Sequence, residues 1–230
     1  MITEKYLKVN LLFINMVRQM IIYEEEKARI NFIHIPSGSK IILRGSFLFP
    51  KDGLVYIEES GELIIEGKRN LLTSEEGWLG IFCLGYLYGE NVVISNGKKE
   101  KGGLIYVPYS GEVELKNFTL EKGNARLGGG IYCEGKVNLK NGEIKYCNAT
   151  WGGGIYSQNE KFSLEKTIIE ACRSERVGGG VRINLSENAV FLGEIFKKCE
   201  FRDNFPEDIA YGDKRATNVN NLWILYRKPK

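Results

Sequence analysis

Residues 124–157 read NARLGGGIYCEGKVNLKNGEIKYCNATWGGGIYS and contain the motif Gly-Gly-Gly-Ile-Tyr twice, at Gly128 and at Gly152. Weaker copies of the motif begin at Asp52, Trp78, Gly102 and Gly178. The six starting points are separated alternately by 26 and 24 residues. A repeat of this length is typical of a solenoid, in which each unit buries the apolar face of its neighbour.

The repeats are built from alternating and β-branched residues interrupted by Gly and Asn, which indicates short strands rather than helices. Because side chains alternate along a strand, one position of the motif forms an inward apolar column. That column contains Val55, Ile81, Ile105, Ile131, Ile155 and Val181. We predict an all-β fold, namely a right-handed, single-stranded parallel β-helix of about 6 to 7 coils with 24 to 26 residues each.

The turns of the predicted coils carry Asn and Gly at recurring positions. Asn96, Asn117 and Asn141 are expected to share one column, where stacked side-chain amides would bond from rung to rung. The triple glycines precede a strand, so we expect a corner that needs positive φ or close backbone packing. A phosphate-binding loop would instead lead into a helix.

The chain divides into three segments. Residues 1–40 lack the repeat and are predicted to be an N-terminal cap over the first coil, with an amphipathic helix as one form of it. Residues 41–211 hold the coils, and residues 212–230 form a tail or second cap. Polar residues interrupt the apolar N-terminal run too often for a membrane span, and it has no typical signal-peptide cleavage site.

Charge and cysteine content exclude several kinds of site. The chain has 32 Lys and Arg against 29 Asp and Glu, interspersed and without a basic block, so we predict no nucleic-acid partner. The 5 cysteines include no CxxC pair, and no metal or other cofactor is predicted. Cys147 and Cys172 fall on adjacent rungs, where a disulfide is sterically allowed, but we favour stacked free thiols.

The repeats resemble a known bacterial family. The form GG[AG]I, paired with Phe-x-x-Asn, is similar to repeats of the chlamydial polymorphic outer membrane proteins and of related right-handed β-helix proteins. The matching stretches lie between residues 102 and 211 and are 128–131, 152–155, a variant at 178–181, and 201–204. This resemblance implies a secreted or surface-exposed passenger used in adhesion or display, hence an extracellular or cell-surface location.

The predicted fold also resembles that of pectate lyases and polygalacturonases, which implies outward carboxylates on the first strand of the coil. Only Asp52 among the 4 aspartates lies near such a strand, and Leu84 and Pro108 interrupt the outward column that contains Glu58 and Glu134. The single histidine, His34, is placed outside the repeats. We therefore predict a non-catalytic module. A polysaccharide lyase or glycoside hydrolase is the alternative, and a structural spacer or a fragment of a larger passenger is a third.

The outward position next to the inward column is the candidate site. It contains Tyr56, Phe82, Tyr106, Tyr132, Tyr156 and Arg182. An exposed aromatic strip of this extent is typical of a binding surface, and we predict a polysaccharide or a host or cell-surface glycan as ligand. Alternatively, the rings stack for stability or lie beneath the turns. The oligomeric state is left open.

Overall fold

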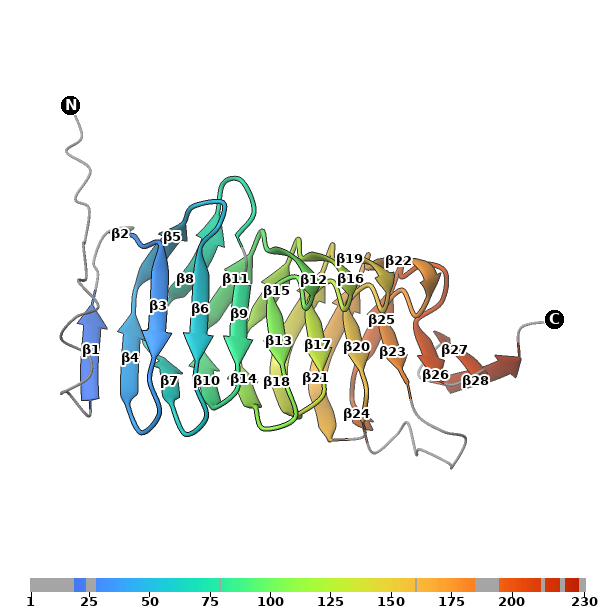
Figure 1. The fold of residues 1–230 in the computed structure, drawn as a ribbon. Helices are drawn as coiled ribbons and strands as arrows, with labels where there is room; N and C mark the ends of the chain where they lie inside the picture. The colour runs from blue at the N-terminus through green and yellow to red at the C-terminus, as the bar shows by residue number, and fades with distance from the viewer. Residues whose placement is uncertain are drawn as a thin grey trace.

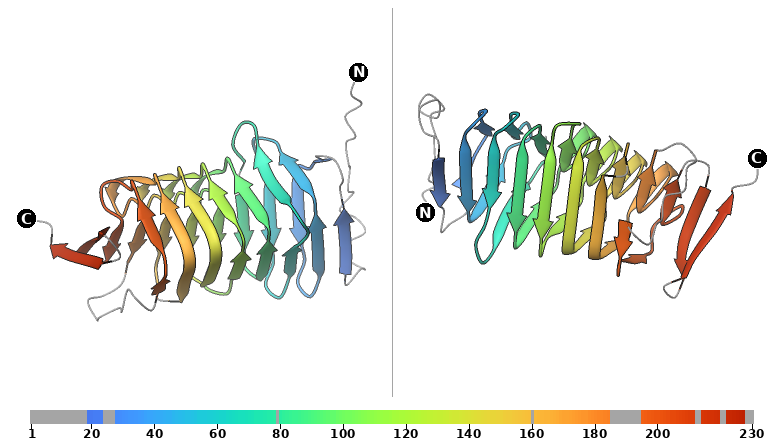
Figure 2. Two further views of the ribbon diagram at one scale, coloured as in Figure 1. Left: turned by 180° about the vertical axis from the view of Figure 1, so that it is seen from behind. Right: turned by 90° about the horizontal axis from the view of Figure 1, so that it is seen from below.

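The computed structural model describes residues 19–23, 28–78, 80–159, 161–184, 195–211, 214–219 and 222–227. These residues wind into an all-β parallel solenoid of about 7 turns, as predicted (Figure 1). The molecule is elongated, with strand β1 (Gln19–Tyr23) at one end and β28 (Leu222–Arg227) at the other (Figure 2). Each turn stacks its strands on those of the turn before.

One wall of the solenoid is a 10-stranded sheet that receives the first strand of every turn. Its parallel strands are β3 (Phe32–Ile35), β6 (Leu54–Ile57), β9 (Gly80–Cys83), β13 (Ile105–Val107), β17 (Ile131–Cys133), β20 (Ile155–Ser157), β23 (Val181–Ile183) and β26 (Ile209–Tyr211). Strands β27 (Lys214–Val219) and β28 then continue this sheet in antiparallel pairing. We call this wall the ladder sheet.

The remaining walls form a 14-stranded sheet that bends around the core. One limb contains β1, β4 (Lys40–Arg44), β7 (Glu62–Ile65), β10 (Tyr86–Glu90), β14 (Glu112–Lys116), β18 (Lys136–Lys145) and β21 (Phe162–Glu170). Strand β24 (Phe196–Lys197) ends this limb, because it pairs with the first half of β21. The other limb contains β2 (Ala28–Arg29), β5 (Ser46–Phe49), β8 (Asn70–Ser74), β11 (Val92–Ser95), β15 (Thr119–Glu121) and β25 (Glu200–Arg202). Strands β18 and β21 run through both limbs without a break.

A small third sheet was not anticipated from the sequence. It has 4 strands, which lie in the corner leading back to the ladder sheet. They are β12 (Lys98–Lys101), β16 (Asn124–Leu127), β19 (Asn148–Trp151) and β22 (Arg173–Val177). Their charged and amide-rich sequences lack the apolar alternation by which strands are recognised, because inward positions such as Lys99, Lys101 and Ala125 carry charged or small side chains.

The predicted inward column is confirmed. Ile105 pairs in register with Ile131, and Ile131 with Ile155, in adjacent parallel strands. All six members of the column are buried, and none is more than 1% exposed. Stacking like residues on successive turns therefore builds one continuous core.

The glycine motif is a structural corner, also as predicted. Gly128 and Gly152 have φ angles of 64° and 65°, a region that favours glycine. A Cβ atom on the next residue, Gly129, would lie 2.3 Å from the carbonyl oxygen of Gly153 in the following turn. The first glycine of the motif thus permits the backbone conformation, and the second permits close approach of the rungs.

The prediction of one asparagine column is wrong in two respects: Asn96 does not belong to it, and its described amides do not bond one another. Asn117 and Asn141 share their corner with Asn91, whereas Asn96 belongs to a second corner, aligned with Lys122. All five residues have positive φ, between 50° and 60°. No amide of this column bonds another among the described side chains. Asparagine recurs here because it tolerates the left-handed conformation.

Pairing in the solenoid begins earlier than the predicted boundary at residue 41. Strand β1 pairs in parallel with β4, and β3 pairs with β6, so the described part of residues 1–40 is strand and not a helical cap. The expected helix within residues 1–18 lies outside the described residues. At the other end, β27 and β28 fall in the segment predicted as a tail or cap.

The cysteines are all buried and unoxidised, in keeping with the stacked thiols that we favoured. They are Cys83, Cys133, Cys147, Cys172 and Cys199. Burial raises the pKa of the Cys83 and Cys133 thiols to about 12. These thiols behave as small apolar groups in the core.

Candidate functional site

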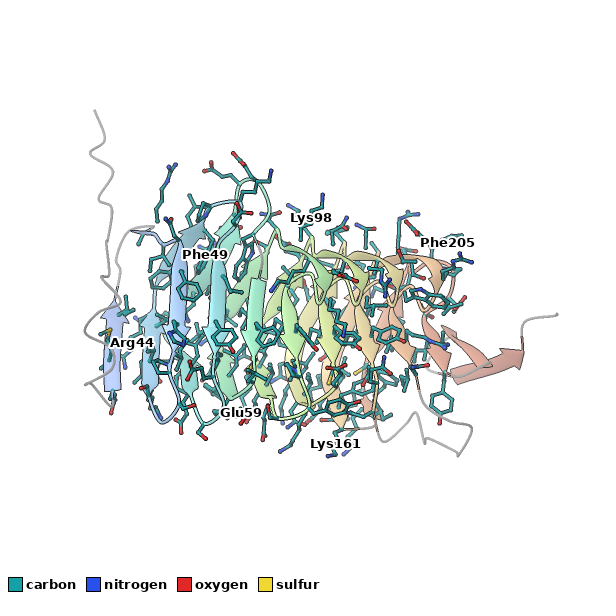
Figure 3. The ribbon with its side chains drawn as sticks, viewed as in Figure 1. Arg44, Phe49, Glu59, Lys98, Lys161 and Phe205 are labelled. Carbon is teal, nitrogen blue, oxygen red and sulfur yellow. The ribbon has the colours of Figure 1, made fainter. Side chains whose placement is uncertain are left out.

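The structure brings the six predicted site residues together in one row along the outer face of the ladder sheet, which faces the viewer in Figure 3. Successive ring centroids are 5.4 Å apart for Tyr56 and Phe82, and 5.0 Å for Phe82 and Tyr106. The distances are 5.2 Å from Tyr106 to Tyr132 and 5.4 Å from Tyr132 to Tyr156. We call these five rings the aromatic ladder; Arg182 pairs with Tyr156 on the next strand.

The row continues one rung further than predicted. His34 pairs in register with Tyr56, at a ring distance of 5.7 Å, so its placement outside the repeats is wrong. Its Nε2 atom lies 2.7 Å from Oε1 of Glu58. The sequence Phe-Ile-His-Ile has no glycine before it, and the alternation of Ile33 and Ile35 was the signal that could have revealed this rung.

Exposure divides the ladder into two halves. Tyr132 and Tyr156 are buried, at 2% and 8% exposure, and we call them the closed half. Tyr56, Phe82 and Tyr106 are half-buried, and we call them the open half. Two exposed rings flank the open half in sequence, Phe32 at 39% and Tyr109 at 79%.

Glu134 accepts hydrogen bonds from Tyr132 of the closed half and from Tyr106, the neighbouring ring of the open half. The hydroxyl of Tyr132 donates to Oε1 of this carboxylate at 3.0 Å, and that of Tyr106 donates to Oε2 at 2.7 Å. Gln158 donates to the Tyr132 hydroxyl at 3.2 Å, and Asn184 donates to Gln158 at 2.8 Å. Burial, with the bond to Glu134, raises the pKa of Tyr132 and Tyr106 well above the usual range.

Lys101 of strand β12 reaches over the same rings. Its Nζ atom is 4.9 Å from the ring centre of Tyr132 and 5.4 Å from that of Tyr106. The same atom lies 3.8 Å from Oε1 of Glu134. The charge of Glu134 is thus balanced within the protein, which fits a structural role for the closed half.

The carboxylate of Glu58, at the open end of the row, is also bonded to other groups of the protein. One of its oxygens accepts the backbone N–H of Ser37 at 2.9 Å, and the other faces His34. These two contacts lower the pKa of Glu58, the bond from Ser37 being the larger cause. The resulting His34–Glu58 pair lies beside Tyr56.

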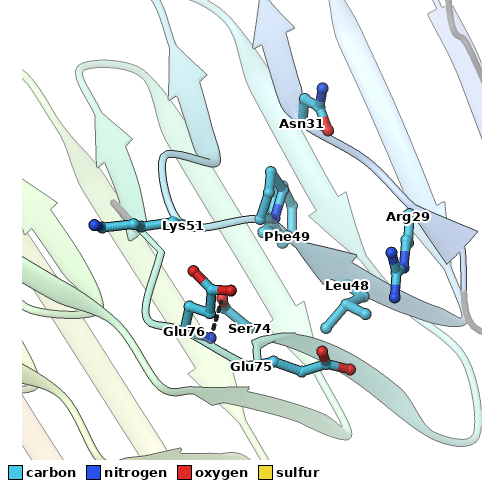
Figure 4. Close-up of a pocket in the computed structure, with 9 residues that line it drawn as sticks. Arg29, Asn31, Leu48, Phe49, Lys51, Ser74, Glu75 and Glu76 are labelled. Carbon is cyan, nitrogen blue, oxygen red and sulfur yellow. Dashed lines mark hydrogen bonds between the residues drawn. The ribbon is translucent and has the colours of Figure 1, made fainter.

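A hollow of about 380 Å³ lies at a different corner of the first turns (Figure 4). Its lining mixes apolar and charged groups and includes Arg29, Leu48, Phe49, Ser74, Glu75 and Glu76. The backbone N–H of Glu76 donates to the Ser74 hydroxyl at 3.2 Å, which ties the loop to its own strand. No histidine or cysteine is among the described lining residues, so this hollow is the weaker candidate.

Other indications of function are sparse. The described residues contain no group of His, Cys, Asp and Glu side chains suited to a metal ion. None of the described segments is a helix of the length and apolarity that a membrane crossing needs. Comparison of the chain with family models, with curated proteins and with solved structures finds no match.

Proposed function

We propose that the protein is a non-catalytic β-helix module that binds a polysaccharide or cell-surface glycan on the open half of the ladder. The supporting observation is that Tyr56, Phe82 and Tyr106 are partly exposed and in ring contact on one sheet face, with Tyr56 stacked on Phe82 at 5.4 Å and Phe82 edge to face with Tyr106 at 5.0 Å. Aromatic rings offer apolar area at little entropic cost, and their faces suit the C–H faces of sugar rings. From His34 to Tyr106 the row spans three rung steps, roughly 14 Å, enough for a short oligosaccharide.

Adhesion or display at the cell surface is the setting that we propose for this binding. It is supported by the resemblance of the glycine repeats to those of the chlamydial polymorphic outer membrane proteins. Protease treatment of intact cells that express the full-length protein tests the location. Degradation without lysis is expected, and complete protection would contradict the proposal.

Catalysis by a pair of carboxylates is less well supported. Glu58 and Glu134 lie in one outward column with two rungs between them, so they are roughly 14 Å apart. Glycoside hydrolases need carboxylates within about 10 Å of each other. A lyase or hydrolase remains the second candidate because of the His34–Glu58 pair, at 2.7 Å beside the open half. New reducing ends or unsaturated uronates that are absent with His34→Ala would favour it.

The binding proposal is tested on an array of neutral and acidic oligosaccharides. Phe82→Ala, in the middle of the open half, is expected to abolish binding. Tyr88→Ala is the matched control, because Tyr88 is an outward, half-buried aromatic residue on β10 of the other sheet, with Lys116 5.2 Å from its ring. Binding that survives Phe82→Ala in a folded protein would exclude the ladder as the site. An array on which the wild-type protein binds nothing would contradict glycan binding and favour the spacer.

A further inference from the structure

Lys99 is a partly buried cation at the edge of the open half. Strand β12 turns Lys99 and Lys101 toward the ladder, and Lys98 and Glu100 toward solvent, as their alternating exposure shows. The Nζ atom of Lys99 is 5.8 Å from the ring centre of Phe82. Burial lowers the pKa of Lys99, and no carboxylate among the described residues forms an ion pair with it.

The carboxylates around the ladder are already engaged by other groups. Glu58 faces His34 and the N–H of Ser37, while Glu134 faces Lys101 and two tyrosine hydroxyls. Glu100, the acidic residue next to Lys99, lies on the solvent side of β12 and pairs with Arg126 at 3.6 Å. Asp52 and Glu76 line the same hollow as Lys99 but form no ion pair with it, so no described carboxylate directly balances the charge of Lys99.

We propose that the open half prefers sugars that carry an anionic group, carboxylate or sulfate, with the anion against Lys99 and the sugar ring on Phe82. This inference rests on the proposed glycan binding and adds the chemical class of the ligand. An ammonium that the fold has already partly dehydrated loses less hydration on binding than a fully solvated one, so its contact with an anion is stronger. The phenyl ring beside it holds the sugar without discriminating between charges.

The experiment uses an array on which the same oligosaccharide backbones are printed in neutral, carboxylated and sulfated form. Lys99→Gln is expected to weaken binding of the anionic forms roughly 10- to 100-fold and to leave the neutral forms unchanged. Lys99→Arg retains the charge and should retain the preference. Lys98→Gln is the matched control on the same strand, since Lys98 lies at the outer edge of the molecule in Figure 3, and should change binding by no more than about twofold.

The outcomes separate this inference from the function on which it rests. Equal binding of neutral and anionic forms by the wild-type protein, or equal effects of Lys99→Gln and Lys98→Gln, would overturn the anion preference while glycan binding stands. Anionic binding that survives Phe82→Ala would place the anion away from the ladder and overturn the inference as well. Binding to no backbone in any form would overturn both. A salt series with the wild-type protein gives a check without mutation, because only the anionic forms should weaken.

Discussion

The two halves of the aromatic ladder occupy the same strand position and differ in what surrounds them. Tyr56 and Phe82 in the open half are 5.4 Å apart, and so are Tyr132 and Tyr156 in the closed half. Both rings of the closed half are buried, and the Tyr132 hydroxyl is bonded to Glu134 and Gln158, whereas the open half keeps part of its ring surface exposed. A repeated residue can therefore be core in one turn of a solenoid and surface in another.

The outward neighbours account for this difference. The column beside the ladder holds Glu58, Leu84 and Pro108 next to the open half, and Glu134 and Gln158 next to the closed half. Glu134 and Gln158 both bond the Tyr132 hydroxyl, whereas Leu84 and Pro108 have no polar side-chain group and Glu58 is engaged by His34 and Ser37. In the open half only Tyr106 reaches Glu134. Burial of a tyrosine is favourable when its hydroxyl finds such a partner.

Truncating a ring should show the largest contrast between the halves. Tyr132→Ala removes a ring that is 2% exposed and is expected to lower the free energy of unfolding by roughly 3 to 5 kcal/mol. Phe82→Ala removes a half-buried ring and should cost roughly 1 to 2 kcal/mol. Urea unfolding followed by circular dichroism measures both. Equal costs would mean that the two halves do not differ in packing.

Substitutions in the inward column should destabilise the protein equally beneath both halves. This serves as an internal reference for the comparison of the rings. Ile81 and Ile155 lie beneath the open and closed halves and are 0% and 1% exposed. Replacement of either by Ala should cost roughly 2 to 5 kcal/mol, with similar values for the two, because each leaves a cavity in the same continuous core. Midpoints of urea unfolding for the two variants, taken with their slopes, provide the test. An Ile155→Ala protein as stable as the wild type would contradict the register itself.

Removal of a single hydroxyl should give a smaller contrast. Tyr132→Phe removes one donor from Glu134, which keeps its contacts with Tyr106 and Lys101, and removes the acceptor of the Gln158 amide, so it should cost roughly 1 to 2 kcal/mol. Tyr56→Phe should change stability by no more than about 0.5 kcal/mol, because no hydrogen bond joins its hydroxyl to the described residues. Thermal unfolding of the two single variants tests this. A larger cost for Tyr56→Phe would reverse the assignment of the halves.

At neutral pH the last expected effect is absent, since it is a dependence of stability on alkaline pH. Burial, with the nearby charge of Glu134, raises the pKa of Tyr132 in the folded protein, while an unfolded tyrosine ionises near about pH 10. Above about pH 10 the unfolded chain therefore loses the proton first, and the free energy of unfolding falls by at most about 1.4 kcal/mol per pH unit from this group. Below about pH 10 Tyr132 is protonated in both the folded and the unfolded protein, so its full contribution to the free energy of unfolding is present. Tyr132→Phe should flatten the decline, and identical pH profiles would contradict it.

Local sequence chemistry was sufficient to predict the architecture. The spacing of Gly128 and Gly152 indicates the coil length, and the alternation around Ile131 and Ile155 places the core, since strand geometry has a fixed period of two. The row from Tyr56 to Arg182 follows from the same period. Each of these predictions depends only on residues within one repeat and its copy.

Only the tertiary structure decided which rings are exposed and where the irregular rungs lie. His34 joins the row through pairing with Tyr56, and Lys99 meets Phe82 because β12 lies in the corner next to the ladder sheet. Asn96 falls on a second left-handed corner that the periodicity does not distinguish from the first. The placements of His34, Lys99 and Asn96 have the same physical reason. Periodicity determines which way a side chain points, but its exposure and partners depend on segments from other turns, and these are brought into contact only when the coils stack.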